Sequence, residues 1–282
     1  MNARTDLAVE SFSAEEMPEG ISMDVRGKAF SITEIVIDDD RYSESLGKGK
    51  GRYITLEGGR LSRFSEDYED MVTEFAAELK DFVPDGDILV VGLGNNDITP
   101  DALGPQTASK VLATRHLRDE FDNEEEAFLT SLRRVSVIAG GVLGQTGIET
   151  AEMITALIAQ LHPAGIIAVD ALACSDVRRL GTTIQLTDSG ISPGSGVANS
   201  RRELSQRMLG IPVTAIGVPT VVDVHTIVRS LTGSRVDPDM PNMIVTPRDI
   251  DRLTERASRL IAFGIDLALH PSLSLADIRG LF

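Results

Sequence analysis

The run "DILVVGLG" (Asp87–Gly94) is an almost unbroken series of aliphatic residues that ends in glycines. Such a run is typical of a β-strand buried on both faces of a sheet. The segment that follows, "ALGPQTASKVLATRHL" (Ala102–Leu117), has helical spacing and carries Pro105 near its first turn, where proline is tolerated. A buried strand, a glycine turn and a helix together predict one unit of an α/β fold.

The same alternation of apolar runs and helical segments continues along the chain. The further strands expected are 135–141, 164–172, 182–190 and 213–223, and the further helices are 62–83, 148–162 and 248–269. Strands rich in Val, Ile and Leu that alternate with helices indicate a parallel sheet covered on both faces. We therefore expect an α/β protein, a three-layer αβα sandwich with a mostly parallel twisted sheet of the phosphorylase/hydrolase-like kind.

The chain before this core differs in composition, because residues 1–50 are polar and acidic with one β-like run at 29–38. We expect residues 7–60 to form an N-terminal arm and β-rich appendage. Residues 61–282 are expected to form a single α/β catalytic core.

Charge and composition exclude several classes of protein. The net charge of −16 argues against direct nucleic-acid binding unless the 27 basic residues cluster. No apolar run reaches the ~18 residues that span a membrane, and the N-terminus does not resemble a signal peptide. The single cysteine, Cys174, excludes an internal disulfide. The four histidines show no zinc-binding spacing.

Three short sequence features resemble known functional motifs but do not match them well. "VVGLGNND" has the first two glycines of a dinucleotide-binding turn, but Asp97 stands where the third belongs. "GISPG" (190–194) matches the serine-hydrolase elbow, yet Pro193 lacks the N–H that would serve the oxyanion hole. Cys174 follows a strand and could be a nucleophile, but a small buried residue in a packed loop is the better interpretation.

Two aspartates near the ends of predicted strands are stronger candidates. Asp101 lies in the turn after the first core strand, and Asp170 ends the apolar run "GIIAVD". A carboxylate at the end of a buried strand is costly unless it is paired, bound to metal or used in catalysis. Asp188 and Asp223 end similar runs and are alternatives. Asp101 could instead be a helix N-terminal acid.

The longest segments of the chain resemble the spore germination proteases (peptidase family A25) of endospore-forming bacteria. The similarity runs from Arg4 to about Asp223 in collinear blocks. These blocks include "RTDLAVE", "GRYITLEGG", "VVGLGNNDITPDALGP", "GVLGQTGIET", "AVDALACSDVRRLGTTIQLTDSGISPGSGVANSRREL" and "LGIPVTAIGVPTVVD".

The resemblance implies an endopeptidase that initiates degradation of small acid-soluble spore proteins during germination. It implies a homotetrameric zymogen of the forespore or spore core cytoplasm, activated by autoproteolysis, with neither nucleic acid nor membrane as a direct partner. The catalytic acids it implies are Asp101 and Asp170. The hydrogenase-maturation endopeptidases are distantly similar in fold and use carboxylates near a bound metal, so Asp101 and Asp170 are also candidate ligands of a divalent metal. No cofactor is required by the sequence, and no histidine here matches those enzymes' ligand.

The first eleven residues, "MNARTDLAVES", are called the leader here. Asp6, Leu7 and Ala8 resemble the Glu-apolar-Ala sites that the family cuts in its substrates. We expect self-cleavage between Asp6 and Leu7, which makes residues 1–6 a short propeptide. A polar terminus without function is the alternative.

The expected chemistry is peptide hydrolysis by a water that the two aspartates activate. Gly140, Gly141, Gly194 and Gly196 could present backbone N–H groups to an extended peptide or its oxyanion. A nucleoside phosphorylase-like hydrolase would share the sheet and glycine loops, and a catalytically silent spore-associated binding protein would share the fold.

Overall fold

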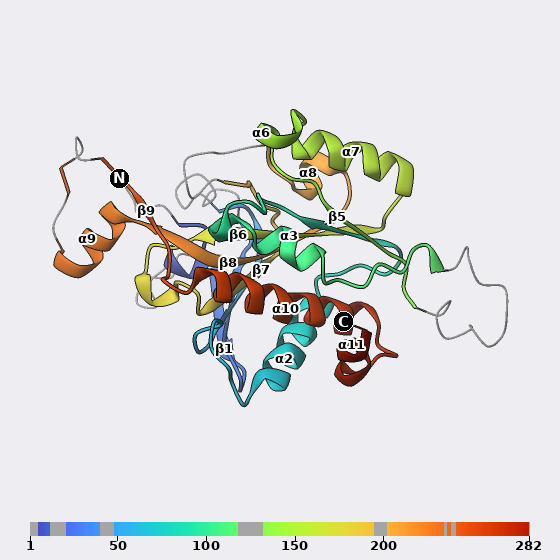
Figure 1. Ribbon diagram of the computed structural model, residues 1–282, viewed down its shortest axis with the longest axis horizontal. Coiled ribbons are helices and arrows are strands. Elements are labelled where there is room, and N and C mark those ends of the chain that lie inside the picture. Colours follow the sequence, from blue (N-terminus) through green and yellow to red (C-terminus); the bar gives the residue numbers. More distant parts are fainter. Residues whose placement is uncertain are drawn as a thin grey trace.

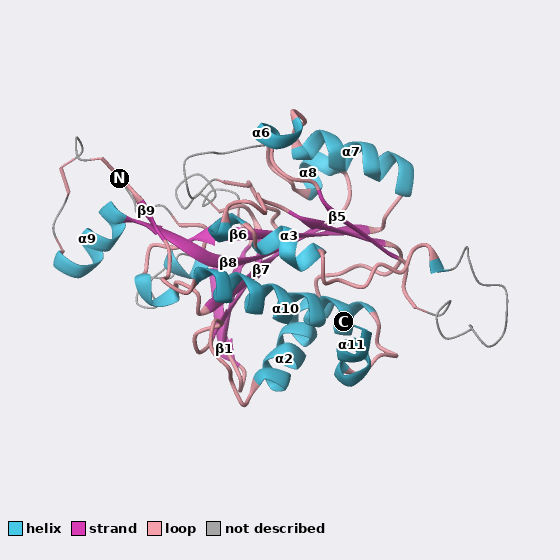
Figure 2. Ribbon diagram, viewed as in Figure 1, coloured by secondary structure: helices cyan, strands magenta, loops and turns pink. Residues whose placement is uncertain are grey.

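A computed structural model describes residues 5–11, 21–39, 48–117, 132–194, 202–233, 236–237 and 241–281. These residues form a nine-stranded sheet with helices packed on both faces (Figures 1 and 2). The strand order is β1-β2-β3-β7-β8-β6-β4-β5, and β9 pairs with β8. The strands are β1 (Ile21–Arg26), β2 (Ser31–Ile37), β3 (Gly51–Glu57), β4 (Ile88–Gly92), β5 (Val135–Ala139), β6 (Gly165–Ala173), β7 (Thr183–Thr187), β8 (Val213–Asp223) and β9 (Ile244–Val245).

Helices alternate with strands from β3 to β6 as expected, whereas β6 and β7 are joined by a link that holds only the 3₁₀ turn η5. They are α2 (Tyr68–Lys80), α3 (Leu103–Ala108), α6 (Leu143–Thr146), α7 (Thr150–Leu161), α8 (Gln206–Leu209), α9 (Val224–Thr232), α10 (Ile250–Leu269) and α11 (Leu275–Leu281), with 3₁₀ turns η1 (Ala8–Glu10), η3 (Thr99–Asp101) and η5 (Val177–Arg179).

The α/β class is confirmed, and the expectation of a mostly parallel sheet is wrong. Only β5, β4, β6 and β8 pair in parallel, whereas β1, β2, β3, β7 and β9 join by antiparallel pairing. The cause lies in residues 174–182, which join β6 to β7. This link is shorter than the dozen or so residues that a parallel crossover needs. β7 therefore returns antiparallel, and β3, β2 and β1 extend the same sheet beyond it.

Helices cover the two faces of the sheet differently. On one face α2, α3 and α10 pack against side chains from the whole sheet width, from Ile32 in β2 to Val135 in β5. On the other face α7 covers the parallel part through Ile154, which packs with Leu89 and Ile166. Over the antiparallel part of that second face lies the described part of the leader, residues 5–11, with Leu7 in a separate cluster. The three layers are therefore complete only over the parallel strands.

The crossing of α2 and α10 requires a glycine. A Cβ added to Gly264 would lie 2.2 Å from Cδ1 of Phe75, a fully buried ring in α2. Glycine inside a helix costs about 1 kcal/mol relative to alanine. Here that cost is offset by the close approach of the two helices.

One predicted helix is much shorter than its periodicity suggested. Within residues 102–116 of the segment expected as a helix over 102–117, only α3 is helical, and it ends at Ala108. Beyond it Leu112 N donates to Asp266 Oδ1 (3.0 Å) and Thr114 N donates to Val135 O (3.0 Å). These tertiary hydrogen bonds draw the chain out of the helix and toward β5. Within the described residues, no helix has the length and apolarity to cross a membrane.

Candidate active site

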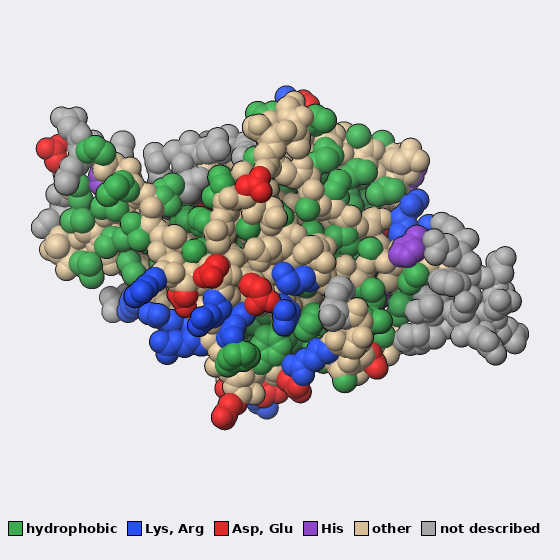
Figure 3. Space-filling view, in the orientation of Figure 1, with side chains coloured by type: hydrophobic (Ala, Val, Ile, Leu, Met, Phe, Trp, Pro, Cys, Tyr) green, Lys and Arg blue, Asp and Glu red, His purple; other side chains and the backbone are tan. Residues whose placement is uncertain are grey.

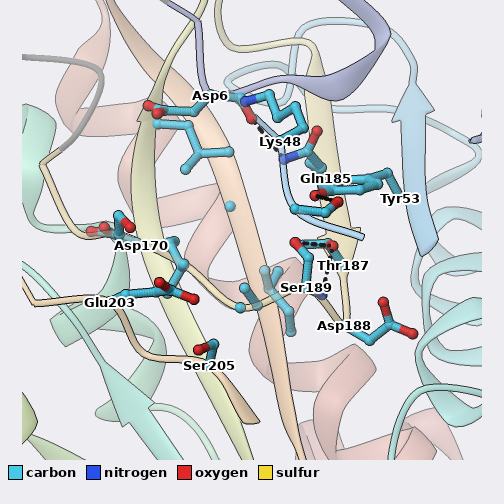
Figure 4. A pocket seen from close by; sticks show the side chains of 18 of the residues that line it. Asp6, Lys48, Tyr53, Asp170, Gln185, Thr187, Asp188, Ser189, Glu203 and Ser205 are labelled. Atoms are coloured by element: carbon cyan, nitrogen blue, oxygen red, sulfur yellow. Dashed lines mark hydrogen bonds between the residues drawn. The ribbon is translucent and has the colours of Figure 1, made fainter. Parts of the chain in front are cut away.

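A cavity of about 820 Å³ opens on the sheet face that carries the leader (Figure 4). Its floor is formed by β6, β7 and β8, and residues 48–50 and 188–194 are among those that form its walls. The polar side chains that line it include Asp6, Lys48, Tyr53, Asp170, Gln185, Thr187, Asp188, Ser189, Glu203 and Ser205. Ser205 Oγ is buried and has no hydrogen-bond partner among the described residues, so this wall holds an unused polar group.

The polar floor follows from the pleat of β7. Ile184 and Leu186 point into the core under α2 and α10, while Gln185 and Thr187 point into the cavity. Alternation with a period of two places successive side chains on opposite faces. The strict Thr-Ile-Gln-Leu-Thr pattern is therefore the sequence signal of a strand with one polar face. Gln185 is not among the site residues predicted from the sequence, although this alternation could have indicated it.

Strand register places Gln185 and Asp170 in one row across the sheet. Gln185 in β7 is paired with Gly217 in β8, and Gly217 is paired with Asp170 in β6. Two strand spacings put their Cα atoms roughly 10 Å apart. Gly217 has no side chain, and Leu172 lies directly over it, since an added Cβ would be 2.4 Å from Leu172 Cγ. The two polar side chains therefore rise from either side of an apolar floor.

Asp170 lies in the cavity as a buried carboxylate with 4% of its surface exposed. Its Oδ1 accepts a hydrogen bond from the Ala171 N–H at 2.9 Å. The strand continues to Ala173, so Asp170 lies inside β6 rather than at its end. Figure 4 shows Asp170 and Glu203 on one side of the cavity, with Lys48, Tyr53, Gln185 and Thr187 on the other.

Asp101 occupies a tight turn after β4 and does not line this cavity. Its Oδ2 accepts the Asn95 N–H at 2.7 Å, and its carbonyl oxygen would be 2.1 Å from a Cβ at Gly94, whose φ is +110°. The turn η3 packs against β6 and β8, and Thr220 Oγ1 in β8 donates to Pro100 O. The structure thus brings Asp101 to the strands under the cavity without placing it among the lining residues.

The donor set for a metal is incomplete. Among the residues that the structure describes, no group of three or more His, Cys, Asp and Glu side chains could hold a metal ion. Asp101 and Asp170 were candidate ligands, and only Asp170 lines the cavity. The described residues therefore do not fit a bound metal ion.

The four glycines expected to present backbone N–H groups to a peptide do not lie together. Gly194 lines the cavity. Gly140 and Gly141 follow β5 at the sheet edge, where a Cβ on Gly140 would be 2.0 Å from Met153 Cε, and neither lines the cavity. Gly196 lies outside the described residues.

The leader is bound against the sheet around the bond predicted to be cut. Asp6 N donates to Ala173 O (3.0 Å), and Ala173 N donates to Asp6 Oδ2 (2.8 Å). Leu7 and Ala8 are completely buried. Gln185 Nε2 donates to Asp6 O (3.0 Å), and Gln185 Oε1 accepts from Ala8 N (2.7 Å). The Asp6–Leu7 bond is therefore fixed beside β6 and β7 at the rim of the cavity.

A second anchor holds the leader at Glu10. The carboxylate accepts hydrogen bonds from Ser175 N (2.6 Å), Ser175 Oγ (2.7 Å) and Asp176 N (2.9 Å), with Arg179 Nη1 at 3.7 Å. Its side chain is only 2% exposed. Hydrogen bonds to a charged group are stronger than neutral ones, so these contacts fix the end of the leader firmly.

Lys48 approaches the leader from the opposite wall. Its Nζ donates to Thr5 O at 3.1 Å. Burial lowers the pKa of Lys48, and the charges of Asp6 and Glu10 act in the opposite direction. Burial thus acts against the charge of Lys48, and the acidic side chains of the leader offset part of that effect.

The other sequence candidates have structural roles. Burial raises the pKa of Cys174 to about 12, so its thiol stays protonated, and it packs beside Leu7 as expected for an inert residue. Asp223 caps α9 by accepting Thr226 N (2.8 Å). Burial acts to raise the pKa of Asp223, but hydrogen bonds from Thr226 and Asn242 outweigh it and lower that pKa. Asp188 accepts Arg52 N (2.7 Å).

Known proteins share these features of sequence. A family model described as "Germination protease" matches residues 4–234. The germination protease of Caldanaerobacter subterraneus subsp. tengcongensis is 38% identical over 100% of this chain and 98% of its own length. That of Clostridium acetobutylicum is 37% identical over 99% of this chain and 98% of its own. That of Priestia megaterium is 44% identical over 80% of this chain and 65% of its own. On the family model and these relatives, this chain belongs to the germination protease family.

Proposed function

We propose that this protein is an endopeptidase that initiates degradation of small acid-soluble spore proteins, and that it activates itself by cutting its Asp6–Leu7 bond. The main support for the proposal is that Gln185 holds the Asp6 carbonyl beside the cavity that Asp170 lines. The family membership supports peptide hydrolysis as the reaction.

In the proposed chemistry Asp170 is the general base. A buried carboxylate in a cavity can take a proton from a water that attacks the Asp6 carbonyl carbon. Asp101 is proposed as the second carboxylate, supported by the contact of its turn with the strands that carry Asp170 and Gly217. Asp170 then gives the proton it took from the water to the departing Leu7 nitrogen, which completes the cut.

The test is mass spectrometry of the N-terminus after incubation of the purified chain, with and without a chelator. We expect loss of residues 1–6, and no loss in Asp170→Asn or Asp101→Asn. Asp97→Asn is the matched control for Asp101, because it is an exposed acid of the same loop. Asp188→Asn is the control for Asp170, because it also lines the cavity. Normal cleavage by both Asp170→Asn and Asp101→Asn would refute the mechanism, and loss in a chelator would require a metal.

We also propose assembly as a homotetramer, as the family resemblance implies. Apolar side chains are exposed at α9 and β9, at the left of the space-filling view (Figure 3), including Leu231 (76% exposed), Met243 (63%) and Ile244 (57%). Exposed apolar groups that adjoin one another mark protein–protein contacts. This surface supports the proposal of self-association.

A further inference from the structure

Gln185 is a buried polar residue in the middle of the sheet. It is 6% exposed, and its strand is paired on both sides, with Thr55 in β3 and Gly217 in β8. A buried carboxamide without hydrogen bonds costs about 1–3 kcal/mol. The hydrogen-bond partners of the Gln185 side chain therefore indicate its role.

Within the described part of the chain, both hydrogen bonds of the Gln185 carboxamide go to the leader. Nε2 donates to the carbonyl of Asp6, and Oε1 accepts from the N–H of Ala8. The two contacts bracket the Asp6–Leu7 bond from both sides. A side chain that contacts only peptide backbone in this way does not depend on the identity of the residues it holds.

We propose that Gln185 is a catalytic residue of this protease, which clamps a substrate peptide on both sides of the cleaved bond and donates to its carbonyl oxygen. The inference rests on the proposed function and deepens it. It applies to the leader and to any peptide that takes the leader's place, because both contacts are to main-chain atoms.

The clamp has a defined part in each step. When water adds to the Asp6 carbonyl carbon, the C=O π bond opens and its electron pair moves to the oxygen, which becomes an oxyanion. Asp170 takes the proton of that water. Gln185 Nε2 already donates to this oxygen at an N···O distance of 3.0 Å, and the hydrogen bond strengthens as the charge develops.

In the second step the oxyanion collapses, the C–N bond breaks, and the nitrogen of Leu7 takes the proton that Asp170 accepted from the water. Water is thereby added across one peptide bond. The products are a carboxylic acid at Asp6 and an amine at Leu7, and transfer of the acid's proton leaves a carboxylate and an ammonium group. The Ala8 contact keeps the departing segment in register during this step.

The row across the sheet gives the clamp its position relative to the base. Gln185 and Asp170 are separated by Gly217 alone, and Leu172 covers that glycine. Leu172 also packs in the same cluster as Leu7. An apolar floor strengthens the electrostatic effect of a hydrogen-bond donor, because little water screens it.

The test compares Gln185→Met, Gln185→Glu and Thr183→Ser, using a synthetic peptide of residues 1–11 as substrate. Gln185→Met loses both contacts, so kcat should fall roughly 10²–10³-fold and KM should rise. Gln185→Glu keeps an acceptor for Ala8 and loses the donor, so kcat should fall while KM stays near the wild-type value. Thr183→Ser, on the same strand and face but not among the residues that line the cavity, should leave both constants unchanged.

Two further readouts separate the clamp from a merely structural role. The introduced carboxyl of Gln185→Glu can donate again when it is protonated, so cleavage relative to wild type should recover as the pH falls. Amide exchange at Ala8 should accelerate in Gln185→Met and stay slow in Gln185→Glu, whether or not the protein is active.

Wild-type kcat and KM in Gln185→Met would overturn the proposal, and so would equal losses in all three variants together with a lowered melting temperature. A wild-type protein that does not cut the peptide would refute the proposed function and the catalytic role of Gln185. The Ala8 exchange would in that case still decide whether the clamp exists.

Discussion

Replacing Asp266 with asparagine should make the protein lose stability steeply as the pH falls from about 6.5 to 4. Asp266 and His270 lie one helical turn apart at the end of α10 and are 0% and 1% exposed. Asp266 Oδ1 accepts Leu112 N, while Asp266 Oδ2 and both ring nitrogens of His270 have no partner within the described residues. Each group is thus buried with little to stabilise its charged form.

Burial shifts the two pKa values in opposite directions. It raises the pKa of Asp266 from 3.8 to about 7, although the Leu112 N–H acts against the shift. It lowers the pKa of His270 from 6.5 to about 4, and the charge of Arg133 contributes to the lowering.

The signs of the two stability effects follow from proton linkage. Above pH 3.8 the unfolded chain loses the Asp266 proton that the folded state keeps, so stability falls as the pH rises toward about 7. Below pH 6.5 the unfolded chain binds a proton at His270 that the folded state refuses, so stability falls as the pH drops toward about 4. Each slope is about 1.4 kcal/mol per pH unit, and between about pH 4 and 6.5 they cancel.

Asp266→Asn keeps the acceptor for Leu112 and removes one of the two slopes. The free energy of unfolding of this variant, relative to wild type, should then decrease by about 3 kcal/mol from pH 6.5 to 4, because the variant lacks the Asp266 titration. His270→Gln should show the opposite slope of similar size. The measurement is urea unfolding at several pH values in this range, where background titrations cancel in the difference from wild type. Variants whose pH slopes match the wild type would refute the reasoning.

Three other variants test the packing and the contacts described above. Gly264→Ala should lower the free energy of unfolding by about 1–3 kcal/mol, measured in urea, because its Cβ would clash with Phe75; unchanged stability would contradict the tight helix crossing. Glu10→Gln should loosen the leader, because a neutral amide replaces the carboxylate that Ser175 and Asp176 hold; limited proteolysis of the N-terminus should accelerate several-fold, and an unchanged rate would show that this anchor is not needed. Leu231→Lys should shift the mass measured by light scattering toward the monomer, whereas an unchanged oligomer would place the contact elsewhere.

Local patterns predicted the core of the fold well. The runs around Val90 and Ile167 are strands, and the periodicity around Phe75 and Ile261 marks helices that pack on them. The direction of β7 could not be read from its residues, because it depends on a short link and on long-range pairing with β3 and β8. The end of α3 at Ala108 likewise depends on tertiary contacts that its own sequence does not reveal.

Residues of the candidate site could be predicted from the sequence only where a single residue stood out from its neighbours. Asp170 stood out as an acid in an apolar run, and it lines the cavity. Asp101 looked similar in sequence, yet it faces the turn of Gly94 and Asn95. Gln185 has no motif of its own. Its relation to Asp170 depends on the register of three strands, which no local pattern encodes.

The burial of Leu7 has a consequence for what a cut at this bond would leave behind. Its nitrogen now donates to Thr5 Oγ1, as a neutral amide in a fully buried residue. Hydrolysis would turn that nitrogen into an ammonium ion, and an unpaired ion in such surroundings costs several kcal/mol. The new chain end would therefore be driven toward water, and Ile35, Tyr53 and Cys174 would lose a neighbour from their cluster. A cut at this bond would therefore change the structure as well as shorten the chain, because the new charge at Leu7 opposes the buried packing that holds the leader in place.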